Sequence, residues 1–182
     1  MAHTESVMLE LGTQAPDFAL TDVTAGRQVH RDHFRGKPLL VMFICPHCPY
    51  VKHIEKTLGK LGRDYADLAI VAISSNDADK YPADNPAGLK AQAEAQGFPF
   101  PYLYDESQAV ARAYKAACTP DIFLFDSSHK LVYRGQYDSS RPGNGIPVTG
   151  EDLRAAIDAV LAGKPVSKDQ RPSIGCNIKW KE

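Results

Sequence analysis

The chain has 182 residues, of which 43% are hydrophobic and 24% are charged, and its formal net charge at pH 7 is -1. This length and balance predict a single soluble globular domain, and the near-zero net charge argues against nucleic acid or an anionic membrane as the main partner. No apolar run approaches the ~20 residues that cross a bilayer, and residues 1–6 carry neither the basic segment nor the apolar core of a secretory signal, so we expect a cytoplasmic protein.

The first third of the chain predicts a hairpin, a buried strand and a helix, in that order. Residues 9–20 form an extended lead-in that pairs with residues 28–30 across a turn. The uninterrupted apolar run 38–44 has the length of a fully buried strand. Apolar residues then recur at helical spacing, which predicts an amphipathic helix over residues 49–65.

The middle of the chain continues the alternation of strands and helices. Residues 68–73 are a second apolar run of strand length. A helix is predicted over residues 86–97, because the segment begins with proline and stops at glycine. Residues 98–104 indicate a short strand that is entered through prolines, and Ser107 is the predicted cap of a helix over residues 108–117.

The last third of the chain predicts a hairpin, a long loop, a helix and a tail. Residues 122–125 and 130–134 form the hairpin. Residues 137–149 are a loop rich in glycine and proline, and loops of this length are often functional. An amphipathic helix is predicted over residues 151–161. The tail, residues 164–182, carries spaced apolar residues, so we expect it to dock on the rest of the molecule.

This order of elements predicts an α/β fold. Strands that alternate with helices imply parallel strands covered on both faces, and the late hairpin adds antiparallel strands. We therefore expect a three-layer α/β/α sandwich with a mixed central sheet and an N-terminal β-hairpin extension. The whole chain, 1–182, is predicted to be one domain, with 164–182 as its docked C-terminal tail.

The motif Cys45-Pro46-His47-Cys48 follows the first predicted strand directly, and Pro49 suits the first position of the helix. The free N–H groups and the partial positive charge of a helix N-terminus stabilise a thiolate. A protonated His47 would add positive charge beside Cys48. Four cysteines in this length are too few for a disulfide scaffold, so redox or catalytic use is the better interpretation.

Short motifs spread over nearly the whole chain carry a family resemblance. They include Gly12-x-x-Ala15-Pro16-Asp17-Phe18, Gly36-Lys37-Pro38, Cys48-Pro49-Tyr50-Val51-Lys52-His53, Cys118-Thr119-Pro120-Asp121 and Pro172-Ser173-Ile174-Gly175-Cys176. Together they resemble the redoxin (AhpC/TSA-type) branch of the thioredoxin fold and, more narrowly, its peroxiredoxin-like proteins. The resemblance implies a cis peptide bond between Thr119 and Pro120, close to the active-site cysteine. It also implies that the Thr119 backbone is free to hold an extended peptide or mixed disulfide, so that Thr119 and Pro120 position the substrate. From its place beside Cys48 we expect His47 to tune the local charge or to orient the substrate.

The resemblance also implies which cysteine is the nucleophile. The interval from Phe43 to Cys48 matches the interval between the strand phenylalanine and the nucleophilic cysteine of thioredoxins. Val51 then stands where thioredoxins have their resolving cysteine. Met42 stands where they keep a buried acid, so proton transfer would need another group.

Three cysteines are candidates for resolving a mixed disulfide at Cys48. Cys45 is the nearest in sequence, and its attack on the mixed disulfide would release the product. Cys118 and Cys176 could pair with each other, or one of them could resolve Cys48 across space. In a reducing cytosol both could equally remain free thiols.

We therefore predict a thiol–disulfide oxidoreductase whose partner is a protein or small-molecule disulfide or thiol. One alternative is a peroxiredoxin-like thiol peroxidase, in which Cys48 becomes a sulfenic acid before a second cysteine condenses with it. Peroxiredoxins require a threonine three residues before their cysteine and a proline four residues earlier still. Here Cys45 and Val41 occupy those positions, which argues against peroxidase chemistry. Another alternative is a non-catalytic binding or redox-sensor module that uses the cis-proline face and the 137–149 loop.

Metal binding is the weakest reading of the motif. Cys45, His47, Cys48 and His53 are all ligand types for zinc. They are crowded within nine residues, however, and no second ligand pair follows elsewhere in the chain. We therefore predict no metal and no other cofactor.

Overall fold

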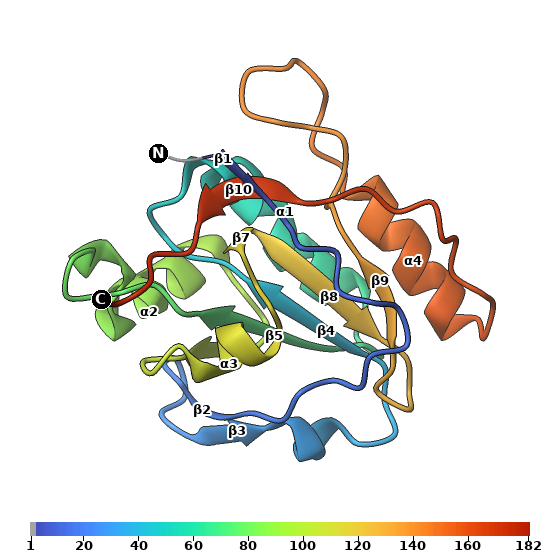
Figure 1. Cartoon of the computed structure of the whole chain (residues 1–182), viewed down its shortest axis with the longest axis horizontal. Coiled ribbons are helices and arrows are strands. Elements are labelled where there is room, and N and C mark those ends of the chain that lie inside the picture. The colour runs from blue at the N-terminus through green and yellow to red at the C-terminus, as the bar shows by residue number, and fades with distance from the viewer. Residues whose placement is uncertain (1–2) are drawn as a thin grey trace.

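The central β-sheet determines the layout of the molecule. In the computed structural model, which describes residues 3–182, seven strands lie in the order β3-β2-β6-β5-β4-β8-β9 (Figure 1). The strands are β2 (Ala19–Asp22), β3 (Gln28–His30), β4 (Leu39–Phe43), β5 (Ala69–Ser74), β6 (Tyr102–Tyr104), β8 (Asp121–Phe125) and β9 (Leu131–Arg134). β4, β5 and β6 are parallel neighbours, whereas β8 and β9 extend the sheet in antiparallel fashion.

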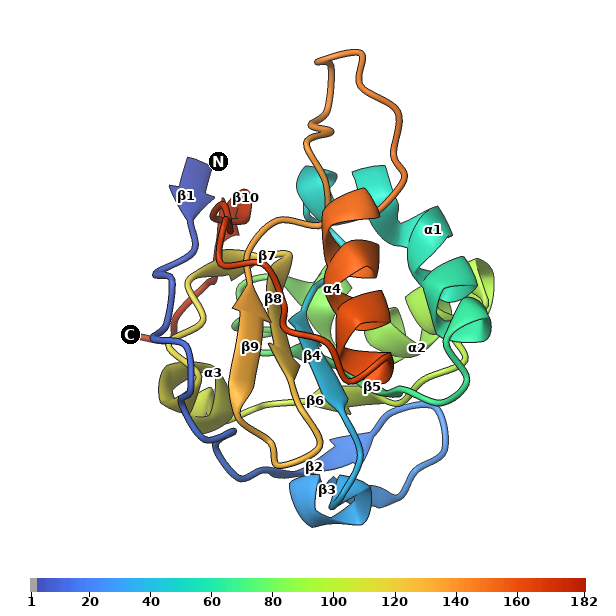
Figure 2. The ribbon, with the colours of Figure 1, turned by 90° about the vertical axis from the view of Figure 1, so that its right-hand side faces the viewer.

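Helices cover both faces of this sheet unequally. The helices are α1 (Pro49–Asp64), α2 (Pro86–Gln96), α3 (Ala109–Ala113) and α4 (Glu151–Leu161), with short 3-10 turns η1 (Arg31–Phe34) and η2 (Pro82–Asp84). Figure 2 shows α1, α2 and α4 together on one side of the sheet and α3 on the other. The chain steps in one direction from β4 to β5 to β6, so right-handed crossovers put α1 and α2 on the same face.

The central strand β4 explains the long apolar run in the sequence. It lies between β5 and β8, and all five of its residues are buried. Leu40 and Met42 face the layer of α1, α2 and α4, whereas Leu39, Val41 and Phe43 face the layer of α3 and the chain termini. Because both faces of β4 are covered by apolar side chains, its sequence shows no polar alternation.

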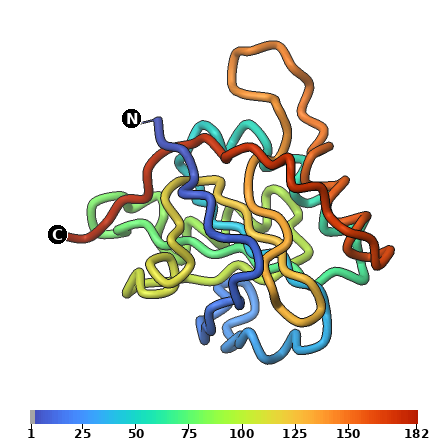
Figure 3. Tube along the Cα trace, turned by 45° about the vertical axis from the view of Figure 1, so that its right-hand side comes forward, coloured from blue at the N-terminus to red at the C-terminus, as the bar shows by residue number. Residues whose placement is uncertain are grey.

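A second, smaller sheet joins the two ends of the chain. Its strands lie in the order β1 (His3–Glu5), β10 (Ile174–Asn177) and β7 (Cys118–Thr119), and both pairings are antiparallel. In Figure 3 the C-terminal segment passes next to the N-terminal segment near the end marked N. This sheet fixes the C-terminal tail beside the segment that precedes Pro120.

The predicted fold class is confirmed, but several element boundaries differ. The first hairpin pairs β2 with β3, so most of the predicted 9–20 strand is an irregular lead-in. The strand predicted over residues 98–104 is limited to β6, because prolines interrupt the residues before it. Among the described residues, no helix is both long and apolar enough to cross a membrane.

Helix α3 is shorter than predicted, and its N-terminus is held by a different residue. Gln108 precedes it with a φ of 66°, which excludes Gln108 from the helix. The carboxylate of Asp105 accepts hydrogen bonds from the backbone N–H groups of Val110 (3.3 Å) and Ala111 (2.9 Å). The predicted cap, Ser107, accepts only a 3.3 Å bond from Ala109 N–H, so Asp105 does most of the capping.

Candidate active site

Cys48 is the residue that caps the N-terminus of α1. β4 ends at Phe43, a short link follows, and Pro49 is the first residue of the helix. The Cys48 side chain is 0% exposed. Its sulfur therefore lies in the positive field of the helix N-terminus and is largely shielded from water.

Two groups from distant parts of the chain contact the Cys48 sulfur. It lies 3.3 Å from the carbonyl oxygen of Thr119, and the Thr119–Pro120 peptide bond is cis, as the family resemblance implied. It also lies 2.8 Å from the sulfur of Cys176, which is 2% exposed. The fold thus brings three of the predicted residues, Cys48, Thr119 and Cys176, into direct contact.

The expectation that the Thr119 backbone is free is wrong. β10 of the same chain pairs with β7, and Cys176 is opposite Thr119 in the register. A C-terminal strand therefore occupies the edge where an extended peptide would otherwise bind. The sequence indicated that the tail docks, but it held no signal for the partner strand because β7 has only two residues.

The pKa values of the thiols around this contact differ from the ordinary value of a cysteine. The hydrogen bond from the Cys45 thiol is the main influence that lowers the pKa of Cys48, with further help from Cys176, Thr119 and the Val51 N–H group, against the opposing effect of burial. The same hydrogen bond, together with burial, raises the pKa of Cys45. Burial and the neighbouring Cys48 raise the pKa of Cys176 to about 12. Cys48 is therefore the thiolate of the group.

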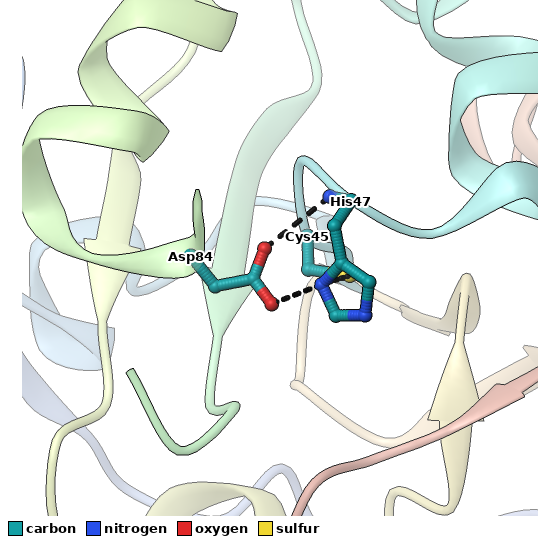
Figure 4. Close-up of side chains that lie close together, drawn as sticks. All are labelled: Cys45, His47 and Asp84. Atoms are coloured by element: carbon teal, nitrogen blue, oxygen red, sulfur yellow. Dashed lines mark hydrogen bonds and ion pairs between the residues drawn. The ribbon is translucent and has the colours of Figure 1, made fainter. Parts of the chain in front are cut away.

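Cys45 lies beside His47, whose ring is paired with the buried carboxylate of Asp84 (Figure 4). The sequence did not identify Asp84 as a site residue. Its sulfur is 3.6 Å from Thr119 Oγ1 and 3.9 Å from His47 Nδ1. His47 Nδ1 is hydrogen-bonded to the carboxylate of Asp84, which also accepts the His47 backbone N–H at 3.3 Å and a bond from Asn76 Nδ2 at 3.0 Å. Asp84 therefore fixes the ring of His47 next to Cys45.

Cys45, His47 and Asp84 also form a group of metal-ligand types, with their ligand atoms within 4.8 Å of one another. The other two ligand types of the sequence motif do not join them. Cys48 faces Cys176, and His53 Nε2 bonds Ser140 Oγ at 3.0 Å. A metal ion bound here would have to break the hydrogen bond between His47 and Asp84. The arrangement therefore favours a role of Asp84 in orienting His47 over a metal site.

Cys118 lies in the same region but its thiol has other partners. Its sulfur lies 3.6 Å from the carbonyl oxygen of Pro120 and 4.0 Å from that of Ser173. Burial and the nearby Asp121 raise the pKa of Cys118. Asp121 is itself buried and accepts the Ala117 N–H at 2.9 Å, and its burial raises its pKa to about 7. Cys118 and Asp121 therefore form a buried pair behind the cis-proline turn that is uncharged below about pH 7.

The long loop 137–149 projects from the body of the molecule beside this region (Figure 1). The Asp138 carboxylate, at the start of the loop, accepts hydrogen bonds from the backbone N–H groups of Thr149 (2.8 Å) and Gly150 (2.7 Å) at the end of the loop. These bonds hold the two ends of the loop together. The bond between His53 and Ser140 ties the loop to α1. A small cavity lies between α1, Pro120 and this loop.

Comparisons with known proteins agree with this architecture. The profile of the AhpC/TSA family matches residues 11–134. The thiol-disulfide oxidoreductase ResA of Geobacillus thermodenitrificans is 29% identical over 135 residues, which are 70% of each chain. The crystal structure of an uncharacterized conserved protein from Geobacillus kaustophilus is 56% identical, with a TM-score of 0.97 over 100% of this chain and 97% of that one.

A more distant solved structure is similar in fold alone. It is a thiol:disulfide interchange protein DsbE from Chlorobium tepidum, with 22% identity and a TM-score of 0.66. The match covers 84% of this chain and 99% of that chain.

Proposed function

The chain belongs to the AhpC/TSA family, and we propose that it is a thiol–disulfide oxidoreductase with Cys48 as its nucleophile. The observation that carries this proposal is the position of the Cys48 sulfur at the N-terminus of α1, 3.3 Å from the carbonyl oxygen before the cis-proline. The lowered pKa of Cys48, caused first by the Cys45 hydrogen bond, supplies a thiolate at neutral pH.

The reaction begins with attack of the Cys48 thiolate on one sulfur of a substrate disulfide. A bond forms between Cys48 and that sulfur, and the other substrate sulfur leaves as a thiolate. A second thiol of the chain then attacks the Cys48 sulfur, and the first substrate sulfur leaves in turn. Two electrons have passed to the substrate, and the chain holds an intramolecular disulfide that an external thiol reductant must reduce.

The substrate class is a thiol or disulfide, either on a protein or on a small molecule. A protein substrate would bind as an extended strand along β7 only after β10, which pairs with that edge in the structure, has moved away. In the cytoplasm, the location that the sequence predicts, thiol reductants would return the chain to its dithiol form.

Insulin reduction with dithiothreitol as the electron source tests the proposal. We expect turnover by the wild-type chain and its loss in Cys48→Ser. Cys118→Ala is the matched control, because Cys118 is equally buried and its thiol faces the carbonyls of Pro120 and Ser173. Thermal unfolding of each variant shows that the fold is intact. Turnover retained in Cys48→Ser would overturn the proposal, and rapid peroxide consumption without insulin reduction would favour the peroxidase alternative.

A further inference from the structure

The C-terminal strand β10 lies where a disulfide substrate has to approach Cys48. Cys176 is opposite Thr119 in the β7–β10 pairing, and its sulfur is 2.8 Å from that of Cys48. A peptide substrate paired with β7 would present its own sulfur at this same place. We propose that Cys176 is the resolving cysteine of this protein, carried on a strand that serves as a built-in substrate segment. This inference rests on the proposed role of Cys48 as nucleophile.

Contacts on both sides of Cys176 hold it in place. Before it, Ser173 accepts the Ser6 N–H at 2.9 Å with its carbonyl and donates its own N–H to Ser6 Oγ at 2.9 Å. After it, the Ile178 N–H donates to the carbonyl of Ala117 at 3.1 Å. These contacts hold the Cys176 sulfur close to the Cys48 sulfur when β10 is paired with β7. The intramolecular attack therefore has a high effective concentration.

The other two thiols are less suited to this step. The Cys45 sulfur lies near Thr119 Oγ1 and His47 Nδ1, and its hydrogen bond to Cys48 stabilises the thiolate of the resting state. Cys118 faces backbone carbonyls. Of Cys45, Cys118 and Cys176, Cys176 has the pKa that is raised least: burial and Cys48 raise it to about 12.

The chemistry of Cys48 controls when Cys176 becomes reactive. The negative charge of the Cys48 thiolate is one of the causes that raise the pKa of Cys176, and Lys179 opposes it. Formation of a mixed disulfide at Cys48 removes that charge, so Cys176 loses its proton more readily only after substrate has reacted. Cys176 then attacks the Cys48 sulfur, the Cys48–Cys176 bond forms, and the substrate sulfur leaves and takes up the proton.

The same geometry implies that β10 must shift before a substrate can enter. Both sulfurs are almost fully buried, with exposed fractions of 0% for Cys48 and 2% for Cys176. A substrate strand and β10 cannot pair with the same edge of β7 at once. The β7–β10 pairing therefore opens before Cys48 attacks the substrate, and the return of β10 delivers Cys176 to the mixed disulfide.

The test uses the chromogenic disulfide dithiobis(nitrobenzoate), mixed in slight excess with the reduced full-length chain. Attack by Cys48 releases one thionitrobenzoate, and resolution releases a second. We expect the wild type to release about two equivalents in one fast phase. Cys176→Ser is expected to release about one and to retain the probe as a mixed disulfide visible by intact mass.

Two further cysteine variants test the alternatives to Cys176. Cys118→Ala is the matched control and should release both equivalents as the wild type does. Cys45→Ala should also release the second equivalent, because Cys176 is still present, but its first phase should be slower because the main hydrogen bond that lowers the Cys48 pKa is lost. Trapping of the mixed disulfide in Cys45→Ala but not in Cys176→Ser would overturn the proposal for Cys176 and leave Cys48 as nucleophile. Fast release by Cys48→Ser would instead overturn the proposed function itself.

Disulfide mapping of the wild type gives an answer that needs no folded variant. After oxidation by one equivalent of the probe and blocking of free thiols, a non-reducing tryptic digest should link the peptide with Cys48 to the peptide with Cys176. No lysine or arginine separates Cys45 from Cys48, so fragment ions must assign the bonded cysteine within the first peptide. A bond between Cys45 and Cys48 would overturn the proposal.

Discussion

The backbone of Gly175 lies against the carbonyl group of Thr119: a β-carbon added at Gly175 would be 1.9 Å from that oxygen. Such an approach is far inside the contact distance of carbon and oxygen, so only glycine allows β10 to pair with β7 at this point. The residue beside Cys176 is therefore as important to the position of its sulfur as Cys176 itself.

We predict that Gly175→Ala loosens β10 without altering the nucleophile. The added methyl group pushes the strand away from Thr119, so Cys48 should react with dithiobis(nitrobenzoate) roughly tenfold faster, equivalent to about 1.4 kcal/mol less for opening the strand. Release of the second thionitrobenzoate should become slower. Stopped-flow absorbance of the two phases measures both effects.

Gly163→Ala is the control for a general loss of stability. Gly163 has a φ of +68°, so alanine is strained there, but no atom lies within 4 Å of the added β-carbon. We expect this variant to unfold more easily while both phases keep their wild-type rates. Equal acceleration in the two variants would mean that global opening, and not β10, limits access to Cys48.

A second prediction concerns the pH dependence of Cys48. A group with a lowered pKa remains a thiolate at pH 6, so the initial rate with the probe should change less than about twofold between pH 6 and 8. In Cys45→Ala the main hydrogen bond that lowers this pKa is lost. The rate of that variant should therefore fall steeply below pH 8. The thiolate absorbance in the ultraviolet, followed during an acid titration, provides an independent measure.

The Cys118→Ala variant controls for the removal of a buried thiol, since Cys118 is not one of the main influences that lower the pKa of Cys48. Its pH–rate profile should overlay that of the wild type. A steep wild-type profile with a midpoint above pH 8 would contradict the assignment of Cys48 as the thiolate.

The sequence was informative where the structure is local. The apolar run and the helical spacing on either side of Cys48 predicted β4 and α1, because burial and periodicity are properties of neighbouring residues. The alternation of Ile174, Cys176 and Ile178 likewise indicated that the tail docks. Its partner could not be predicted, since pairing of β10 with β7 joins residues more than fifty positions apart.

The same reason explains why Asp84 and Asp121 were not singled out as site residues. Asp84 is in the short turn η2 and has no local pattern, yet the fold brings it to His47. Asp121 is a charged residue at the edge of an apolar strand, where an exposed position is the ordinary expectation. It is buried because β8 pairs with β4, opposite Phe43. Both are consequences of tertiary packing that spacing along the chain does not encode.

A third prediction separates the structural role of Asp84 from the reactivity of Cys48. Asp84→Asn replaces an acceptor of three hydrogen bonds with a group that also donates, so it should lower the free energy of unfolding by about 1–3 kcal/mol. Asp84 is not one of the main influences on the pKa of Cys48. The first phase with the probe at pH 7 should therefore stay within about twofold of the wild type.

Urea unfolding and metal analysis check this prediction together. Asp79→Asn is the matched control, because Asp79 is an exposed carboxylate a few residues before Asp84. It should leave stability unchanged. Zinc that copurifies with the wild type and is lost from Asp84→Asn would contradict the hydrogen-bonding role and identify Cys45, His47 and Asp84 as a metal site.

The last prediction follows from the buried carboxyl group of Asp121. Burial raises its pKa from 3.8 to about 7, so the folded chain binds this proton more tightly than the unfolded chain. The stabilisation is fully present below about pH 4 and is lost as the pH rises through about 7. Asp121→Asn remains neutral and can still accept the Ala117 N–H. Its advantage in stability over the wild type should therefore grow by about 3 kcal/mol between pH 5 and pH 8.

Urea unfolding at several pH values between 5 and 8 measures this difference. The decline of stability with pH should be visible in the wild type and flattened in Asp121→Asn. Asp67→Asn is the control, because Asp67 is exposed and its variant should keep the wild-type slope. If the slopes of wild type and Asp121→Asn are the same, the Asp121 carboxyl group is ionised in the folded protein throughout this range, and the neutral pair with Cys118 does not exist.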